Sequence, residues 1–320
     1  MAITAPAPAS VPAPAPRPGT GPLVPEWGAT SHVIDLGSEI HFADFGGPDD
    51  GDLPPIVLVH GLGGSYANWG MIAPLLAKHS RVYALDLIGF GLSNPAGRSA
   101  TVSANSRLVT DFIDTVADGR AVLVGNSMGG LISMMVASAY PEKVAGLALL
   151  DPVLPRVRTG PHDPRVIMGF SAFLVPGLGT RFLRSRRTMP PRDVVMEALR
   201  LCSPHPGRIP EAEVQVAVEI TERRNVQEGL EKAYLEAVRS LLGKMVRYGQ
   251  FHAMLRSLRM PVTLLCGEAD RLVPIGSSRA VARRCPEWQF ESFPDVGHIP
   301  MMEIPEVIAD RIGVLLSGIR

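Results

Sequence analysis

The segment AVLVGNSMGGLI, residues 121–132, places the strongest single constraint on how this chain can fold. It joins a β-branched, apolar run to a helix-forming run through the pattern Gly-x-Ser-x-Gly, with Ser127 at its centre. In a tight turn between a strand and a helix, such a serine is held in a strained backbone conformation that projects its hydroxyl group from the sheet edge. The flanking Gly125 and Gly129 then stand where a Cβ atom would clash. The segment therefore predicts a buried strand, a sharp turn and a helix that present one serine.

Short apolar runs and helical patterns alternate on both sides of this segment. Strands are expected at 39–46, 55–60, 81–87, 121–126, 144–151, 261–268 and 288–293, and helices at 66–79, 103–119, 128–141, 276–285 and 306–318. Repeated strand–helix units predict an α/β fold with a mostly parallel, doubly wound sheet. Residues 152–257 carry helical patterns without a strong strand candidate, so we expect an inserted helical cap there. The core then comprises residues 31–151 and 258–320.

The composition excludes several classes of protein. Residues 1–30 alternate Ala with Pro and lack the apolar run of a secretory signal, so we expect a disordered Ala/Pro-rich tail. The longest apolar stretch elsewhere, at 166–179, is too short to span a membrane. The 31 basic residues balance 31 acidic ones, which argues against a nucleic-acid partner. Three scattered cysteines indicate a reducing compartment, so we expect a cytoplasmic protein. The sequence has no evident metal-ligand cluster, phosphate-binding glycine loop or dinucleotide fingerprint, so we expect no metal site and no organic cofactor.

A serine nucleophile needs a base, an orienting carboxylate and hydrogen-bond donors for an oxyanion. Among the eight histidines, His298 lies just past an expected strand and before the last helix, at the same sheet edge as Ser127. Asp270 also follows a strand and is the first candidate for the acid. Asp151 ends another strand and is the alternative acid. Asp86 ends a third strand, but its sequence context favours a structural turn at the rim of the site.

Five motifs follow one another along the core: HGLGG at 60–64, DLIGFGLS at 86–93, GNSMGG at 125–130, GEADRLVP at 267–274 and GHIPMMEIPE at 297–306. Their order resembles the α/β-hydrolase family over about residues 33–151 and 258–320, and the insertion lies where that family carries its cap. The resemblance implies Ser127 as the nucleophile, His298 as the base and later the acid, and Asp270 as the carboxylate that holds the imidazole.

The resemblance also implies the groups that support this chemistry. The backbone N–H groups of Leu62 and Met128 would form the oxyanion hole, where they would bind the charge that develops in the transition state. Gly61 would let its loop approach the substrate closely. His60 would have a structural role and hold the same loop.

The identity of the nucleophile separates this chain from other members of the fold. Epoxide hydrolases and haloalkane dehalogenases carry an aspartate where this chain has Ser127, so neither activity is expected. We expect a serine hydrolase that cleaves carboxylic esters with small to medium apolar acyl groups through an acyl-enzyme. Carbon–carbon hydrolases of ring-fission products are similar in having asparagine before the serine, but they usually carry Trp where this chain has Ile299. Thioesterase, acyltransferase and non-hydrolytic ligand-binding functions are further alternatives.

The start of the insertion bears on substrate and partners. The stretch VIMGFSAFLVPGLG at 166–179 suits an acyl-binding wall or a lipid-facing lid, and packing against the core explains it equally well. The arginine cluster RFLRSRRTMPPR at 181–192 suits anionic head groups, a substrate carboxylate or a solvated surface. The expected partner is a small-molecule ester, and a peripheral membrane contact through the cap is a second expectation.

Overall fold

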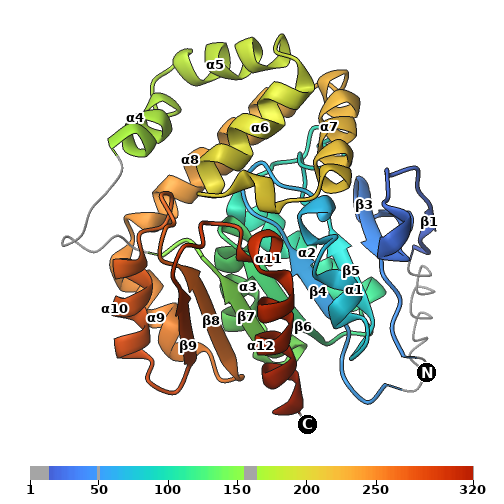
Figure 1. Ribbon diagram of the computed structural model, residues 1–320, viewed down its shortest axis with the longest axis vertical. Helices are drawn as coiled ribbons and strands as arrows, with labels where there is room; N and C mark the ends of the chain where they lie inside the picture. Colours follow the sequence, from blue (N-terminus) through green and yellow to red (C-terminus); the bar gives the residue numbers. More distant parts are fainter. Residues whose placement is uncertain (1–13, 49–50, 155–163, 320) are drawn as a thin grey trace, which may run out of the picture.

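The computed structural model describes residues 14–48, 51–154 and 164–319. In these ranges a nine-stranded sheet has the order β1-β2-β3-β5-β4-β6-β7-β8-β9 (Figure 1). The strands are β1 (Arg17–Pro18), β2 (Thr30–Asp35), β3 (Glu39–Asp44), β4 (Ile56–Val59), β5 (Val82–Leu85), β6 (Ala121–Asn126), β7 (Val144–Leu150), β8 (Val262–Gly267) and β9 (Gln289–Phe293). The pairs from β1 to β3 and the β3–β5 pair are antiparallel, and all later pairs are parallel. The mostly parallel sheet predicted from the sequence is confirmed.

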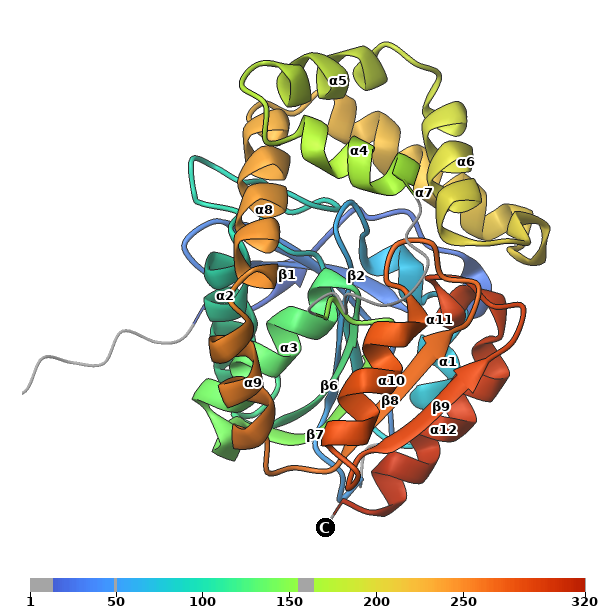
Figure 2. The same ribbon diagram turned by 90° about the vertical axis from the view of Figure 1, so that its left-hand side faces the viewer.

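Helices cover both faces of this sheet, because its central strands are apolar on both sides. In β4, Val57 and Val59 belong to one buried cluster, whereas Ile56 and Leu58 belong to the other. Successive side chains of a strand point to opposite faces, so each cluster lies on one side of the sheet. The first side is covered by α2 (Val102–Val116), α3 (Met128–Ala139), α9 (Tyr248–Ser257) and α10 (Ile275–Arg284), and the second by α1 (Ala73–Leu76) and α12 (Pro305–Ser317) (Figure 2).

A helical insertion follows β7 and lies over the carboxyl ends of the strands (Figures 1 and 2). It consists of α4 (Pro164–Ala172), α5 (Leu178–Arg187), α6 (Pro191–Cys202), α7 (Glu211–Asn225) and α8 (Leu230–Met245). The next helix, α9, packs against α3 in the core layer, where Ser257 Oγ lies 2.6 Å from Ser138 Oγ. The insertion thus ends at α8, before the boundary at residue 257 that the sequence predicts. In the described ranges, no helix has both the length and the apolar composition needed to cross a bilayer.

The predicted disordered tail of residues 1–30 is wrong for residues 14–30, while residues 1–13 lie outside the described ranges. β1 pairs antiparallel with β2 and extends the sheet at its edge. A short 3₁₀-helix, η1 (Pro25–Trp27), then places Trp27 in the core with only 4% of its surface exposed. The indole Nε1 donates a hydrogen bond to Glu213 Oε1 at 2.8 Å, which links this segment to α7 of the insertion. The Ala/Pro-rich composition of this segment favours disorder, but the buried side chain of Trp27 fixes its second half to the core.

Replacing Trp27 with Ala is expected to destabilise the protein by about 3–5 kcal/mol, because a large buried side chain would leave a cavity. The free energy of unfolding in urea measures the effect. Val226→Ala is the control, since Val226 is 83% exposed, and it should change stability by less than about 0.5 kcal/mol. Equal stability of both variants would show that the segment around Trp27 does not belong to the folded core.

Candidate active site

Ser127 stands at the turn between β6 and α3 with φ 54° and ψ −117°. A positive φ is uncommon for a residue other than glycine, and such strained conformations cost about 1–3 kcal/mol each. The side chain is largely buried but retains 8% exposure. The backbone is held from both sides, because Ser127 N donates to Leu150 O at 3.0 Å and Val153 N donates to Ser127 O at 3.0 Å. The strained strand-to-helix turn expected for a nucleophilic serine is present.

The glycines around Ser127 stand where three backbone segments meet. A methyl group at Gly125 would lie 2.6 Å from Gly129 O, and one at Gly129 would clash with the carbonyl oxygen of Val59 in β4. A methyl group at Gly61 would lie 3.0 Å from Ser127 Cβ. The predicted steric role of Gly125 and Gly129 therefore has a direct cause: no side chain fits between β4, β6 and the start of α3. The close approach of the Gly61 loop to a substrate stays a prediction.

His298 and Asp270 meet at the same edge of the sheet. His298 follows β9 and precedes the short helix α11 (Pro300–Glu303), and Asp270 follows β8. His298 Nδ1 lies 2.6 Å from Asp270 Oδ2, and both residues are at least nine-tenths buried. The other carboxylate oxygen of Asp270 accepts hydrogen bonds from Leu272 N at 2.7 Å and Val273 N at 3.0 Å. Because both oxygens are engaged, the carboxylate holds the imidazole in one orientation.

Asn126 joins the serine turn to the histidine loop. Its Nδ2 donates to Leu150 O at 3.0 Å and to His298 O at 2.9 Å. The residue immediately before Ser127 therefore bonds directly to the backbone of His298. In the sequence, Asn126 is only a point of similarity to carbon–carbon hydrolases. Its positioning role has no local signal, because it depends on a contact between residues 172 positions apart.

Asp151, the alternative acid, lies behind the His298–Asp270 pair. It is 1% exposed and has φ 42°, and both of its carboxyl oxygens lie 3.1 Å from Gly267 N, which donates to them. Burial first, and then the negative charge of Asp270, raise the pKa of Asp151 well above its ordinary value. A side-chain hydrogen bond between the Asp151 and Asp270 carboxyl groups raises the pKa of Asp151 further. Asp270, and not Asp151, contacts His298.

The two predicted oxyanion donors flank Ser127. Leu62 lies one residue past Gly61, whose backbone abuts the serine. Met128 is the first residue of α3, so its N–H has no acceptor within the helix. The N–H of Met128 also lies at the amino-terminal end of α3, where partial positive charge accumulates. The role of Leu62 and Met128 as oxyanion donors stays a prediction.

His60 has the structural role expected for it. Leu87 N donates to His60 Nε2 at 3.1 Å, which leaves the proton on Nδ1, and Nδ1 donates to Gly61 O at 2.7 Å. The ring is fully buried, and this burial lowers the pKa of His60, so the imidazole stays neutral. Asp86 is likewise structural: it accepts hydrogen bonds from Tyr66 N at 2.7 Å and Leu92 N at 2.8 Å. Both residues brace the loops around the site.

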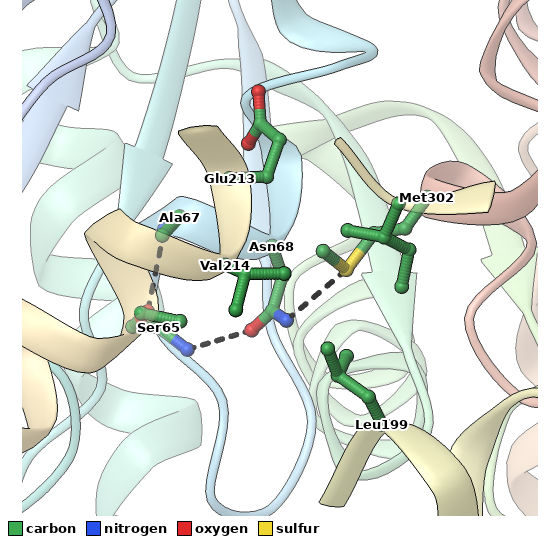
Figure 3. Close-up of a pocket in the computed structure, with 9 residues that line it drawn as sticks. Ser65, Ala67, Asn68, Leu199, Glu213, Val214 and Met302 are labelled. Carbon is green, nitrogen blue, oxygen red and sulfur yellow. Dashed lines mark hydrogen bonds between the residues drawn. The ribbon is translucent and has the colours of Figure 1, made fainter. Parts of the chain in front are cut away.

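Two cavities in the described part of the chain lie away from the candidate residues. One of about 40 Å³ lies between α6, α7 and η2 (Tyr66–Trp69), and Figure 3 shows Ser65, Asn68 and Met302 on its wall. It has room for a water molecule but none for a substrate. A more open pocket of about 510 Å³ is lined by residues 94–98 and 227–236. In the described ranges, no three His, Cys, Asp or Glu side chains are grouped so that they could hold a metal ion.

The fold and this edge of the sheet define a known class of protein. A model of the alpha/beta hydrolase family matches residues 56–311, from β4 through the insertion to α12. The chain therefore belongs to the α/β-hydrolase family.

Several members of this family are similar in sequence. The chain is 29% identical over 260 residues to the dihydrolipoyllysine-residue acetyltransferase component of an acetoin cleaving system from Pseudomonas putida, covering 81% of this chain and 62% of that protein. It is 29% identical over 274 residues to a pimeloyl-[acyl-carrier protein] methyl ester esterase from Aromatoleum aromaticum, covering 83% and 99%. It is 26% identical over 281 residues to a 2-hydroxymuconate semialdehyde hydrolase from a Pseudomonas species, covering 84% and 89%. The chain thus spans less than two thirds of the first of these proteins.

Solved structures agree on the fold. Cfl2 from Burkholderia cenocepacia matches with a TM-score of 0.76 and 22% identity, covering 92% of this chain and 98% of that chain. Naproxen esterase from Bacillus subtilis matches with a TM-score of 0.68 and 20% identity, covering 92% of each chain. At these identities the likeness concerns the architecture alone.

Two conservative substitutions separate the roles of the carboxyl groups. Asp270→Asn is expected to lower kcat for an ester by about 10⁴, because the imidazole loses the charge that orients it. Asp151→Asn should stay within about tenfold of the native kcat, since the contact that orients His298 comes from Asp270 and is kept. Steady-state kinetics on a p-nitrophenyl ester, with thermal unfolding as the check on folding, measure both. The reverse pattern would make Asp151 the acid.

Proposed function

We propose that this protein is a serine hydrolase that cleaves carboxylic esters with apolar acyl groups through an acyl-enzyme. One observation carries the proposal: the strained Ser127 turn is bonded through Asn126 to the loop whose His298 is paired with Asp270. A serine, a buried histidine–carboxylate pair and adjacent backbone donors are the groups that acyl transfer requires. None of them would be needed in this geometry for binding alone.

The reaction follows from these roles. Ser127 Oγ attacks the ester carbonyl carbon while His298 Nε2 accepts the hydroxyl proton. The N–H groups of Leu62 and Met128 donate to the oxyanion of the tetrahedral intermediate. The imidazolium then gives its proton to the leaving alkoxide, so that an alcohol departs and the acyl group stays on Ser127. Water, deprotonated by His298, attacks the acyl-enzyme and releases the acid with Ser127 regenerated.

The surroundings of the oxyanion loop support an apolar acyl group. Leu62 packs against an apolar cluster of the insertion that contains Phe173, Leu235 and Val238, with Tyr234 beside them. The rings of Phe173 and Tyr234 lie 5.6 Å apart. An acyl chain bound to Ser127 would therefore lie along a wall of aliphatic and aromatic side chains, and burying it there is favourable by about 0.8 kcal/mol per CH₂ group. Of the roles considered for residues 166–179, we therefore favour the acyl-binding wall.

The relatives support ester chemistry and name one alternative. The pimeloyl methyl ester esterase acts on a methyl ester and is matched over nearly its whole length. The 2-hydroxymuconate semialdehyde hydrolase represents the carbon–carbon hydrolases. Asn126 is the residue that makes this chain similar to the carbon–carbon hydrolases. Its presence is explained by a structural role, because both hydrogen bonds of its Nδ2 go to backbone carbonyls of the protein. Ester cleavage is therefore the first candidate, with thioester cleavage and acyl transfer to another acceptor as variants of the same acyl-enzyme chemistry.

A substrate series tests the proposal. Purified protein is assayed against p-nitrophenyl esters from C2 to C16, acyl-coenzyme A thioesters and a ring-fission diketone, with Ser127→Ala as the control. We expect ester turnover with a maximum at one chain length, and none above background for Ser127→Ala. Turnover of the diketone without ester turnover would replace the proposal with a carbon–carbon hydrolase. No turnover of any of these substrates would contradict a hydrolytic function.

A further inference from the structure

α4, α5 and the turn between them expose large apolar side chains. We call this surface the α4–α5 face. Its exposed apolar residues are Met168 (70% exposed), Leu174 (56%), Val175 (49%), Leu178 (47%) and Phe182 (45%). They are spread over α4, the following turn and α5, within fifteen residues of chain. Exposed apolar side chains that gather in this way mark surfaces that meet another apolar phase or a partner, whereas isolated ones need no explanation.

The same segment is strongly basic in a chain whose formal net charge is zero. Residues 164–187 contain five arginines and no Asp or Glu. Arg186 pairs with Glu197 on α6 at 2.8 Å, and Arg187 pairs with Glu231 on α8 at 2.8 Å. These two arginines hold α5 to the rest of the insertion.

Arg181 and Arg184 differ from their neighbours. Both are exposed, and neither forms an ion pair within the described ranges. On α5, Arg181 lies three residues after Leu178 and Phe182 lies four residues after it, so each neighbours Leu178 on the helix surface. Positive charge without an ion-pair partner in the described ranges thus stands next to exposed apolar side chains on the same helix. This combination of cationic and apolar side chains is typical of helices that lie in the interface of an anionic bilayer.

The α4–α5 face lies at one end of the molecule, where a flat surface such as a bilayer could reach it. Figures 1 and 2 place α5 at the end of the molecule farthest from the sheet, with α4 next to it in the chain, and no other labelled element lies beyond α5. Its inner side belongs to the apolar wall described above, because the ring of Phe173 lies 5.7 Å from Phe182 and 5.6 Å from Tyr234. A bilayer bound to the outer side would therefore be separated from the acyl wall by a single layer of side chains.

We propose that the α4–α5 face docks this protein on the surface of an anionic lipid bilayer. The apolar side chains enter the boundary between head groups and acyl chains, and Arg181 and Arg184 meet the phosphate groups of the lipids. A second copy of the chain fits less well, because a symmetric contact would bring these unpaired arginines toward one another. Docking does not depend on ester hydrolysis, so it is independent of the proposed function.

Vesicle sedimentation tests the proposal with the whole chain. Ser127→Ala is used beside the native protein, so that lipid turnover cannot affect the result. Both are mixed with vesicles of phosphatidylcholine alone or with 30% phosphatidylglycerol, at about 0.1 M salt. We expect binding to the anionic vesicles, weaker binding at higher salt and little binding to neutral vesicles. Equal binding to both vesicle types, or no binding to either, would overturn the proposal.

Paired variants locate the contact. Arg181→Gln with Arg184→Gln should weaken binding by about 25-fold, that is about fivefold for each arginine near the surface. Leu174→Ser with Phe182→Ser should reduce it to the level of neutral vesicles. The controls are Arg120→Gln, which lies just before β6 at the opposite edge of the sheet, and Val314→Ser, which is 53% exposed on α12. Equal loss in the controls, or no loss in the paired variants, would contradict docking through this face.

The alternative occupant is tested with the same proteins. Analytical ultracentrifugation of the native protein should give a monomer–oligomer distribution that Leu174→Ser with Phe182→Ser leaves unchanged. Dissociation of a dimer in that variant, combined with no vesicle binding by the native protein, would assign the face to a second copy of the chain. An unchanged thermal midpoint shows that each variant is folded.

Discussion

The close approach of α3 to β4 is the constraint on which the rest of the site depends. The first turn of α3 touches the backbone of β4 so closely that Gly129 cannot carry a side chain without striking Val59 O. The chain must turn sharply between β6 and α3 to reach this position, and Ser127 takes up the turn with a positive φ. The strain is held by buried hydrogen bonds on both sides, and it presents the hydroxyl group at the edge where the other loops converge.

The insertion contributes to the geometry of the histidine loop as well as covering the sheet. At the end of α6, Cys202 O accepts a hydrogen bond from His298 N at 2.6 Å. The next residue, Ser203, donates from Oγ to Glu303 Oε2 at 2.7 Å, and the other oxygen of Glu303 accepts from Gly297 N at 2.9 Å. The position of His298 therefore depends on α6 and α11 together. A movement of the insertion would therefore shift the His298 loop relative to Ser127.

Most of the core and the candidate catalytic residues could be predicted from the sequence, because their signals are local. Strand periodicity, the glycines around Ser127 and the positions of Asp270 and His298 after strands need only a few neighbouring residues to be recognised. The rest depends on distant contacts. Trp27 is ordered by Glu213, and the raised pKa of Asp151 depends on its burial and on the charge of Asp270. The single helix expected at 66–79 divides into η2 and α1 instead, and Gly70, which follows η2, lies against the indole of Trp27, where no side chain fits.

Covalent labelling shows directly whether Ser127, presented by the strained turn, is a nucleophile. The native protein, Ser127→Ala and Ser133→Ala are treated with a fluorophosphonate, and intact mass and peptide mapping locate the adduct. Ser133 is a matched control, because it lies in the same helix α3, is fully buried and has an Oγ with no partner in the described ranges. We expect one label per chain, on Ser127, in the native protein and Ser133→Ala, and none in Ser127→Ala. An unlabelled native protein, or a label that persists in Ser127→Ala, would contradict it.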